Sequence, residues 1–564
     1  MKDDGQQWAH SSAIVLSGYC QLSLPQRCLA RFSSLRIIPM HNDVLRSPPR
    51  RGFCNLLIGG SALTLASTGF GALAASLASS TKTATTAPGF TDGFTRGAPE
   101  LHGVSADAIL AFLEAAQSSG FELHSFMLYR RGAVIAEGWW DPYRADRIHM
   151  THSATKSFAV CGVGLALAEG RFRLRDKVVS FFPEMLPADV DPKLAAMTVE
   201  DLLTMRTGHA EEVSGSVWRQ IKTSWVAEFF KIPVVHQPGT KFVYTSAATY
   251  MLSAIISKTT GQPLRDYLQP RLFEPLNITR FEWPLDPHGI SPGANGLSCE
   301  TADLLKLGVL HLQNGMWNGK QVLPREWVAA VQAQHVPGKY GYQWWLGPHD
   351  YSARGLFGQY VLVFPESDAV LAMTAAIQPG RNFLGGLLYK HFPAAFGKQP
   401  LPDDARADLR LRAVTATLQL LPPLKPSHSR LAGRISGQRF DMEANEDGVR
   451  SLQFDFSETR CRFTMTDERG VHTIEAGLRE RIESTTSMSA YKLHHEYQFD
   501  VMRVSAGGSW QDERTFVMTW CFFESTFRDT VVCVFSDRGV TMERRANVNS
   551  GPLARPVMSG RIAS

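Results

Sequence analysis

The run from His152 to Gly170 constrains this chain more than any other segment. It begins Ser153-Ala-Thr-Lys156 and continues through an apolar stretch of helical length, Phe158 to Ala168. Residues three apart lie on one helix face, one turn from each other, which places the Ser153 hydroxyl beside the Lys156 amine. Apolar surroundings lower the pKa of a lysine, and a helix N-terminus favours negative charge beside the serine. The segment therefore predicts a serine nucleophile with a lysine as its base.

The flanking segments support this interpretation. Residues Phe126 to Trp140 alternate like two strands around an Arg-Gly turn, so the serine follows a hairpin and opens a buried helix. Downstream, Tyr244-Thr-Ser246 precedes a helical run, Ala247 to Thr259. A tyrosine at this place can share proton transfer with Lys156, provided that a nearby cation favours its phenolate. The pattern Gly-x-Ser291-x-Gly is rejected as a nucleophile site, because nearby prolines prevent the strand and helix that it needs.

These motifs resemble those of the serine beta-lactamase and penicillin-binding superfamily, in its class C-like branch of esterases, D-amino-acid peptidases and oligomer amidases. Ser153 and Lys156 match the first family motif, and Tyr244 and Ser246 match the second. The similarity extends from about Pro99 to Phe396 and includes the phrase Tyr340-Gly-Tyr-Gln-Trp-Trp345. The resemblance implies an acyl-enzyme at Ser153, with Lys156 and Tyr244 moving protons and Ser246 in the proton network. Which of Lys156 and Tyr244 is the general base stays open.

The third family motif departs from the usual pattern. Many members have Lys or His two residues before a glycine on a strand, and if Gly358 is that glycine, Leu356 stands in place of the cation. Arg354 lies on the same strand face by the period of two, so it either supplies the charge or points to solvent. An oxyanion hole needs only backbone N–H groups. By resemblance, those donors are the N–H groups of Ser153 and Gln359.

The order of elements predicts an α/β (α+β) fold, an antiparallel sheet flanked by helices plus a helical lobe, with the active site between them and an all-β domain after them. Alternating segments beyond a proline-rich boundary indicate a β-sandwich or barrel. The predicted parts are a leader, a linker, a hydrolase domain, a connecting segment, a β domain and a tail. Their ranges are 1–78, 79–98, 99–400, 401–428, 429–550 and 551–564.

The leader resembles a twin-arginine export signal, because Arg50-Arg51 precedes a weakly apolar stretch, Leu56 to Ala78, with Ala72-Leu-Ala74 as a cleavage signal. We expect a periplasmic or secreted protein without a permanent membrane span, since that stretch is rich in Gly, Ser and Thr; an uncleaved anchor is the alternative. Met40 is a more ordinary start for such a signal, which would leave residues 1–39 untranslated.

Composition narrows the classes of partner. Of 564 residues, 44% are hydrophobic and 20% charged, and the formal net charge of +5 comes from dispersed basic residues. This pattern predicts no nucleic-acid partner. Eight cysteines, three of them in the leader, form no disulfide framework, and neither a metal site nor a cofactor is predicted. Oligomeric state is left undetermined.

The sequence thus predicts an exported serine hydrolase that cleaves small carboxylic esters or amides. The alternative enzyme is a beta-lactamase or D-Ala-D-Ala carboxypeptidase. The alternative from another class is a non-catalytic, ligand-binding relative of penicillin-binding proteins, which the missing cation at Leu356 favours.

Overall fold

The computed structural model describes residues 92–563, apart from 214, 381–383, 489–491 and 497–498. The predicted leader, including the Arg50-Arg51 pair, lies outside these residues. In the described part of the chain, no helix is both long enough and apolar enough to cross a membrane.

A six-stranded antiparallel sheet forms the base of the predicted hydrolase domain, in the order β2-β1-β11-β10-β9-β8. Its strands are β1 (Glu122–Arg130), β2 (Ala133–Trp139), β8 (Trp345–Leu346), β9 (Tyr351–Gly355), β10 (Gln359–Phe364) and β11 (Ala369–Ala376). The expected hairpin is present: Arg131 and Gly132 both have positive φ, 46° and 91°, between β1 and β2. Two such residues make the turn whose twist suits a tight hairpin.

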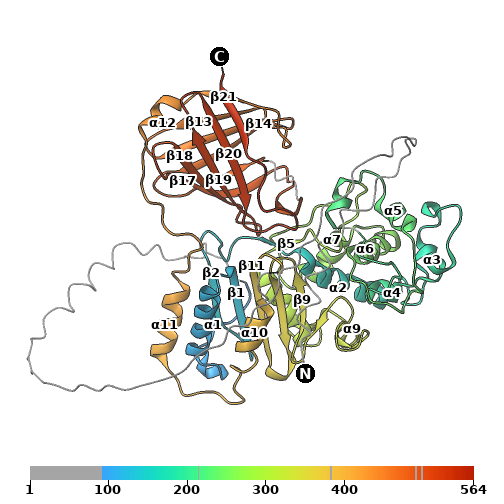
Figure 1. The fold of residues 1–564 in the computed structure, drawn as a ribbon. Coiled ribbons are helices and arrows are strands. Elements are labelled where there is room, and N and C mark those ends of the chain that lie inside the picture. The colour runs from blue at the N-terminus through green and yellow to red at the C-terminus, as the bar shows by residue number, and fades with distance from the viewer. Residues whose placement is uncertain (1–91, 214, 381–383, 489–491, 497–498, 564) are drawn as a thin grey trace, which may run out of the picture. The chain divides into compact units, whose positions relative to one another are not determined.

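Helices cover both faces of this sheet, as the order of elements predicted. On one face lie α1 (Ala106–Ser118), α10 (Leu384–His391) and α11 (Ala405–Thr415), which appear beside β1 and β2 in Figure 1. On the other face, α8 (Thr301–Leu312) packs against β1, β10 and β11. The strands are buried along almost their whole length, because both faces are covered.

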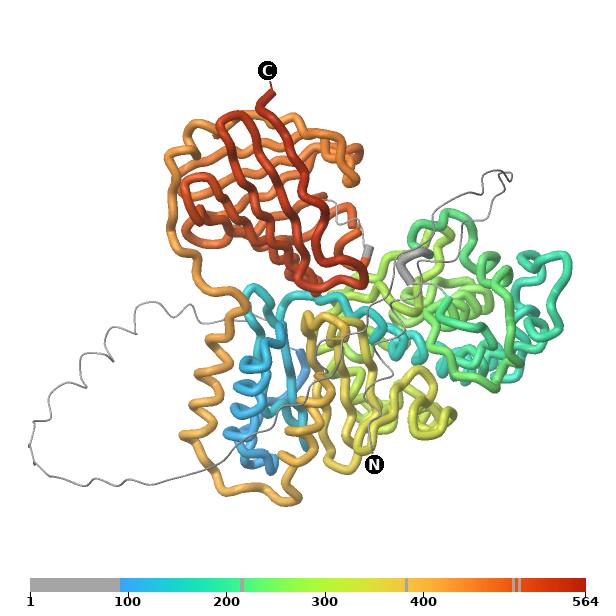
Figure 2. Tube along the Cα trace, viewed as in Figure 1, coloured from blue at the N-terminus to red at the C-terminus, as the bar shows by residue number. Residues whose placement is uncertain are grey.

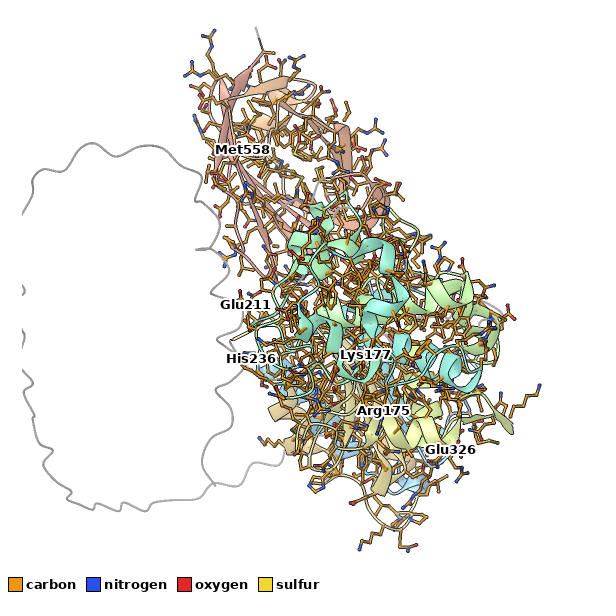
Figure 3. All side chains as sticks on the ribbon, turned by 90° about the vertical axis from the view of Figure 1, so that its right-hand side faces the viewer. Arg175, Lys177, Glu211, His236, Glu326 and Met558 are labelled. Carbon is orange, nitrogen blue, oxygen red and sulfur yellow. The ribbon has the colours of Figure 1, made fainter. Side chains whose placement is uncertain are left out.

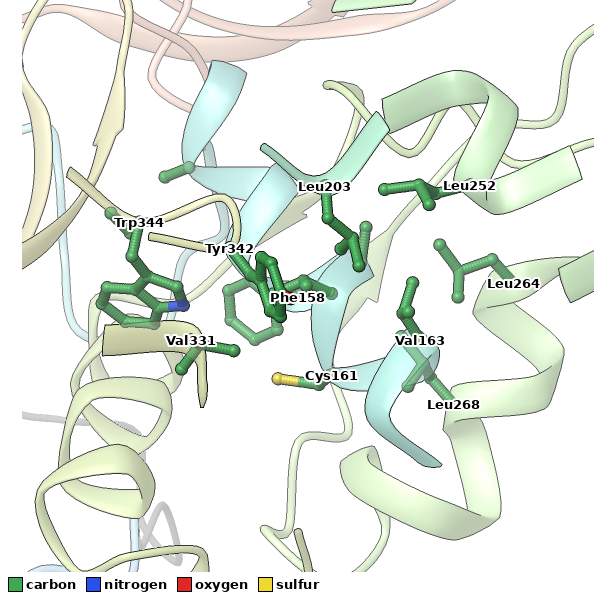
Figure 4. Close-up of a cluster of buried hydrophobic side chains, with 14 of the residues drawn as sticks. Phe158, Cys161, Val163, Leu203, Leu252, Leu264, Leu268, Val331, Tyr342 and Trp344 are labelled. Atoms are coloured by element: carbon green, nitrogen blue, oxygen red, sulfur yellow. The ribbon is translucent and has the colours of Figure 1, made fainter. Parts of the chain in front are cut away.

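The helical lobe comes from the part of the chain that runs from β3 (His149–Met150) to β8. Its main helices are α2 (Thr155–Ala168), α3 (Pro192–Ala196), α4 (Val199–Leu203), α5 (Trp225–Lys231), α6 (Ser246–Thr260), α7 (Leu264–Leu268) and α9 (Arg325–Gln332). Helix α2 is apolar on all sides and is enclosed by side chains such as Leu203, Leu252 and Leu264 (Figure 4). A helix that is hydrophobic all round is a buried helix.

The C-terminal part is a ten-stranded β-barrel, one of the two architectures expected. The strands are β12 (Arg439–Met442), β13 (Ser451–Phe456), β14 (Arg460–Asp467), β15 (Gly470–Gly477), β16 (Ile482–Thr486), β17 (Met502–Trp510), β18 (Thr515–Cys521), β19 (Arg528–Phe535), β20 (Gly539–Ala546) and β21 (Met558–Ile562), drawn in orange to red in Figure 2. Pairing of Gly477 in β15 with Gly507 in β17 closes the sheet. Inward aromatic side chains, including Phe454, Phe463 and Trp520, fill the interior.

Three predicted boundaries need correction. The tail 551–564 contains β21, which begins at Met558 (Figure 3) and pairs with β12 and β20; a five-residue strand behind two prolines has too little pattern to be recognised. The linker 79–98 ends too late, because Gly97 N donates to Val134 O at 3.1 Å. The connecting segment 401–428 contains α11, whose buried residue Leu411 joins the core beneath α1.

Candidate active site

Ser153 lies in a 3-10 turn, η2 (His152–Ala154), that leads from β3 directly into α2. Lys156 follows one turn later in α2 and is only 1% exposed. The expected spacing is therefore realised: Lys156 Nζ is 3.0 Å from Ser153 Oγ. The two side chains meet at the N-terminal end of a buried helix.

Lys156 makes two further contacts, which bring the second motif to the first. Its Nζ donates to Ser246 Oγ at 3.3 Å and to the carbonyl oxygen of Ala294 at 3.0 Å. Burial lowers the pKa of Lys156 from 10.5 to about 7, and the charge of Glu212 opposes this change. All three contacted oxygens are uncharged, so they compensate an ammonium poorly. A large share of the amine is consequently neutral near pH 7.

Tyr244 precedes α6 and presents its ring to the same site. The Lys156 Nζ lies 4.9 Å from the Tyr244 ring centroid, and the Trp345 ring stacks on Tyr244 with centroids 5.3 Å apart. Burial raises the pKa of Tyr244 well above 10, a hydrogen bond with Ser153 opposes the rise, and Glu212 adds to it. The sequence made the role of Tyr244 conditional on a cation that favours its phenolate, and burial acts against that phenolate. Tyr244 is a protonated phenol at neutral pH.

Glu212 is the residue of this site that the sequence did not reveal. Its carboxyl group hydrogen-bonds with Ser246 and interacts electrostatically with Lys156. Although the residue as a whole is exposed, nearby protein atoms desolvate its carboxyl and raise its pKa, while Lys156 and Ser246 oppose that rise. Thr245 holds the loop that carries Glu212, since its Oγ1 donates to the carbonyl oxygen of the adjacent Val213 at 2.8 Å. No motif marks this glutamate, because the contact joins a loop to a distant helix.

Arg354, for which supplying the charge and pointing to solvent were both left open, instead makes side-chain hydrogen bonds. Its Nε donates to Ser352 Oγ at 2.8 Å and its Nη2 to Tyr389 Oη at 3.1 Å, and Tyr389 in turn donates to Asp350 at 2.8 Å. The guanidinium is thus committed to this polar group rather than directed at Tyr244. Leu356 packs against an apolar cluster that continues into the barrel core.

The backbone around Gly358 nevertheless reaches the nucleophile's turn. Strands β9 and β10 contact η2, and a Cβ atom placed on Gly355 would collide with the carbonyl oxygen of Thr151. Gly358 has φ +102°, and the buried side chain of Gln359 donates to Leu356 O at 3.0 Å and Ala375 O at 2.9 Å. The turn that carries the Gln359 N–H is therefore tightly held beside Ser153.

A small hollow of about 30 Å³ adjoins Ser246 and Ala294, two of the residues that accept from Lys156. Aromatic rings of Trp218, Trp225 and Tyr250 line it, together with Arg219. Arg219 is held by the barrel, because its Nη1 donates to the carbonyl oxygen of His495 at 2.8 Å. Across residues 92–563 with the gaps given above, no group of three or more His, Cys, Asp or Glu side chains is arranged to hold a metal ion.

The hydrolase part of the chain is similar to known proteins. The family model described as Beta-lactamase matches residues 112–389. The 6-aminohexanoate-dimer hydrolase of Paenarthrobacter ureafaciens is 24% identical over 277 residues, which cover 44% of this chain and 71% of that protein. Lovastatin esterase of Penicillium rubens is 27% identical over 169 residues, which cover 26% of this chain and 42% of that protein. A solved family VIII carboxylesterase aligns with a TM-score of 0.43 and 15% identity, covering 54% of this chain and 99% of that chain.

The matched segment contains Ser153, Lys156, Tyr244 and the complete six-stranded sheet. The resemblance inferred from the motifs is confirmed, and both relatives have names that describe hydrolases. Residues 112–389 therefore form a serine hydrolase domain of the beta-lactamase family.

Proposed function

We propose that this domain hydrolyses small, uncharged carboxylic esters or amides through an acyl-enzyme at Ser153. The observation that carries the proposal is the 3.0 Å contact between Lys156 Nζ and Ser153 Oγ, made by an amine whose pKa is lowered to about 7. A hydroxyl becomes an effective nucleophile when an adjacent base takes its proton. The buried amine meets that requirement near neutral pH.

Burial lowers the pKa of Lys156 and raises the pKa of Tyr244. In this proposal Lys156 is therefore the base and Tyr244 the acid. Neutral Lys156 takes the proton of Ser153 as its Oγ attacks the substrate carbonyl. Protonated Tyr244, linked to Ser153 by a hydrogen bond, gives a proton to the departing alcohol or amine and regains one from Lys156. Water then attacks the acyl-enzyme and gives a proton to Lys156. Protonated Lys156 returns that proton to the departing Ser153 Oγ, and the acid leaves. The N–H groups of Ser153 and Gln359 stabilise the oxyanion in both steps.

The preference for an uncharged substrate rests on Leu356. A charge-assisted hydrogen bond to a substrate carboxylate is worth roughly 1.5–3 kcal/mol, or about ten- to a hundredfold in rate. A leucine side chain cannot make this hydrogen bond, and the guanidinium of Arg354 donates to Tyr389 instead. The rings of Trp218, Trp225 and Tyr250 beside Ser246 offer an apolar surface to such a substrate.

One observation favours a second candidate, a beta-lactamase or D-Ala-D-Ala carboxypeptidase. Arg219 lines the hollow beside Ser246 and brings a guanidinium to it from a part of the chain outside the third motif. A guanidinium is well suited to bind a carboxylate, which penicillins and peptidoglycan stems carry. Arg219 therefore replaces Arg354 as the residue on which this alternative depends.

Labelling and kinetics test both candidates. A fluorophosphonate probe with intact-mass detection should label the wild type once and leave Ser153→Ala unlabelled, whereas Ser291→Ala should still react. Persistent labelling of Ser153→Ala would refute the assignment. The wild type should have a higher kcat/KM for p-nitrophenyl butyrate than for nitrocefin. Leu356→Lys should bring the two kcat/KM values closer together. Faster nitrocefin turnover that is selectively lost in Arg219→Ala would instead establish the second candidate.

We further propose that the protein is exported by the twin-arginine route. The support is the Arg50-Arg51 pair before the mild apolar stretch that begins at Leu56. Twin-arginine export carries folded proteins, with which the five buried free cysteines of the described residues are compatible.

A further inference from the structure

Two residues at the candidate oxyanion hole have strained backbones. His152, directly before Ser153, has φ +48°, and Phe357, two residues before Gln359, has φ +65°. Neither is a glycine, and a bulky residue in the left-handed region is strained. Such conformations persist only where the surroundings hold them, so something must hold both turns.

The barrel supplies the contacts that hold them. The His152 and Phe357 rings lie 5.3 Å apart, and Phe527, in the loop between β18 and β19, lies 6.1 Å from the first and 5.9 Å from the second. The neighbouring Thr526 Oγ1 is 3.3 Å from His152 Nε2. All four side chains are buried, with exposures of 3% or less. One barrel loop thus packs against both strained turns at once.

This loop is rigidly mounted within the barrel. The His494 ring stacks on Phe527 with centroids 4.5 Å apart, and His494 Nε2 is 2.7 Å from Asp529 Oδ1. Asp529 also accepts from Arg544 Nε at 2.7 Å. The buried aspartate keeps a lowered pKa, because these charged and hydrogen-bonding partners outweigh the desolvation that raises it. These contacts tie the loop to the rest of the barrel.

The barrel makes further polar contacts with the hydrolase domain, from this loop and from the segment after β20. Met150, at the end of the strand that enters the Ser153 turn, donates its N–H to Glu524 O at 3.0 Å. Arg528 pairs with Glu122 at 2.7 Å in β1. Asn549, which follows β20, and Gln378, which follows β11, exchange hydrogen bonds of 2.8 and 2.9 Å.

We infer that Phe527 and Thr526 of the barrel are positioning residues for the hydrolase reaction. Through His152 and Phe357 they fix the two turns that present the Ser153 and Gln359 N–H groups to the developing oxyanion. The barrel is then part of the catalytic apparatus rather than an independent accessory domain. This inference rests on the proposed acyl-enzyme function.

The test uses the full chain and compares matched substitutions. Phe527→Leu should lower kcat for p-nitrophenyl butyrate by about tenfold or more, approaching the hundredfold or greater cost of losing one oxyanion donor, with KM little changed. The control is Phe516→Leu, the same change at another buried barrel phenylalanine, whose ring contacts are with Phe456, Trp510 and Gly508. The control should lose thermal stability to a similar degree but keep kcat.

A second pair covers the case in which Phe527→Leu fails to fold. Thr526→Val removes the hydroxyl near His152 and should lower kcat, and Thr526→Ser should restore it. If the fluorophosphonate labels the wild type at Ser153 but these variants keep the wild-type kcat, the inference is overturned while the proposed function stands. Absence of label at Ser153 in the folded wild type would overturn both.

Discussion

The pH dependence of ester hydrolysis probes the protonation of Lys156. Burial lowers its pKa from 10.5 to about 7, so about half of the amine is neutral at pH 7, against about one part in three thousand for an exposed lysine. Because only the neutral amine accepts the Ser153 proton, kcat/KM should rise about tenfold per pH unit below about pH 7 and level off above it.

Glu212 provides a perturbation of known sign. Its negative charge raises the pKa of Lys156, in opposition to burial. Glu212→Gln removes that charge, so the pKa of Lys156 should fall further and the acid limb of the profile should move to lower pH. Glu211→Gln is the matched control, since it removes the same formal charge from the adjacent exposed residue.

The assay is kcat/KM for p-nitrophenyl butyrate between about pH 5 and 9, corrected for spontaneous hydrolysis. The expected result is an inflection near pH 7 in the wild type and in Glu211→Gln. In Glu212→Gln the inflection should lie at a lower pH. An inflection near the ordinary lysine value in the wild type, or an upward movement in Glu212→Gln, would refute the assignment of Lys156 as the base.

Three further outcomes are expected. Tyr244→Phe should lower kcat by a factor of about a hundred or more, the usual scale for losing an acid/base group, with an unchanged circular dichroism spectrum; a near-normal rate would remove Tyr244 from proton transfer. Deletion of residues 557–564 should lower the Tm, because it removes β21 and exposes the facing edges of β12 and β20; an unchanged Tm would mean that β21 adds nothing to the barrel. N-terminal sequencing of the exported protein should give a start near Ala75, and an intact Met1 or Met40 would contradict cleavage there.

Local pattern was sufficient for much of this protein. The spacing of Ser153 and Lys156 determines their contact, because helical backbone dihedrals place residues three apart on one face. The Arg131-Gly132 turn and the alternating strands of the barrel were likewise predictable, since each depends on neighbouring residues. The order of elements predicted the antiparallel sheet flanked by helices, and the family resemblance matched Tyr244 to the second motif.

Only the tertiary structure decided the surroundings of these residues. Glu212 reaches Lys156 from a loop, Arg354 turns to Tyr389, and Phe527 of the barrel meets His152, which is 375 positions away in the chain. Such contacts depend on how loops and domains pack, and no short-range periodicity encodes that packing. The sequence by itself therefore predicted Ser153 as the nucleophile, with Lys156 and Tyr244 as its partners in proton transfer. The fold determined the environment of these side chains, because burial and charge come from residues distant in the chain.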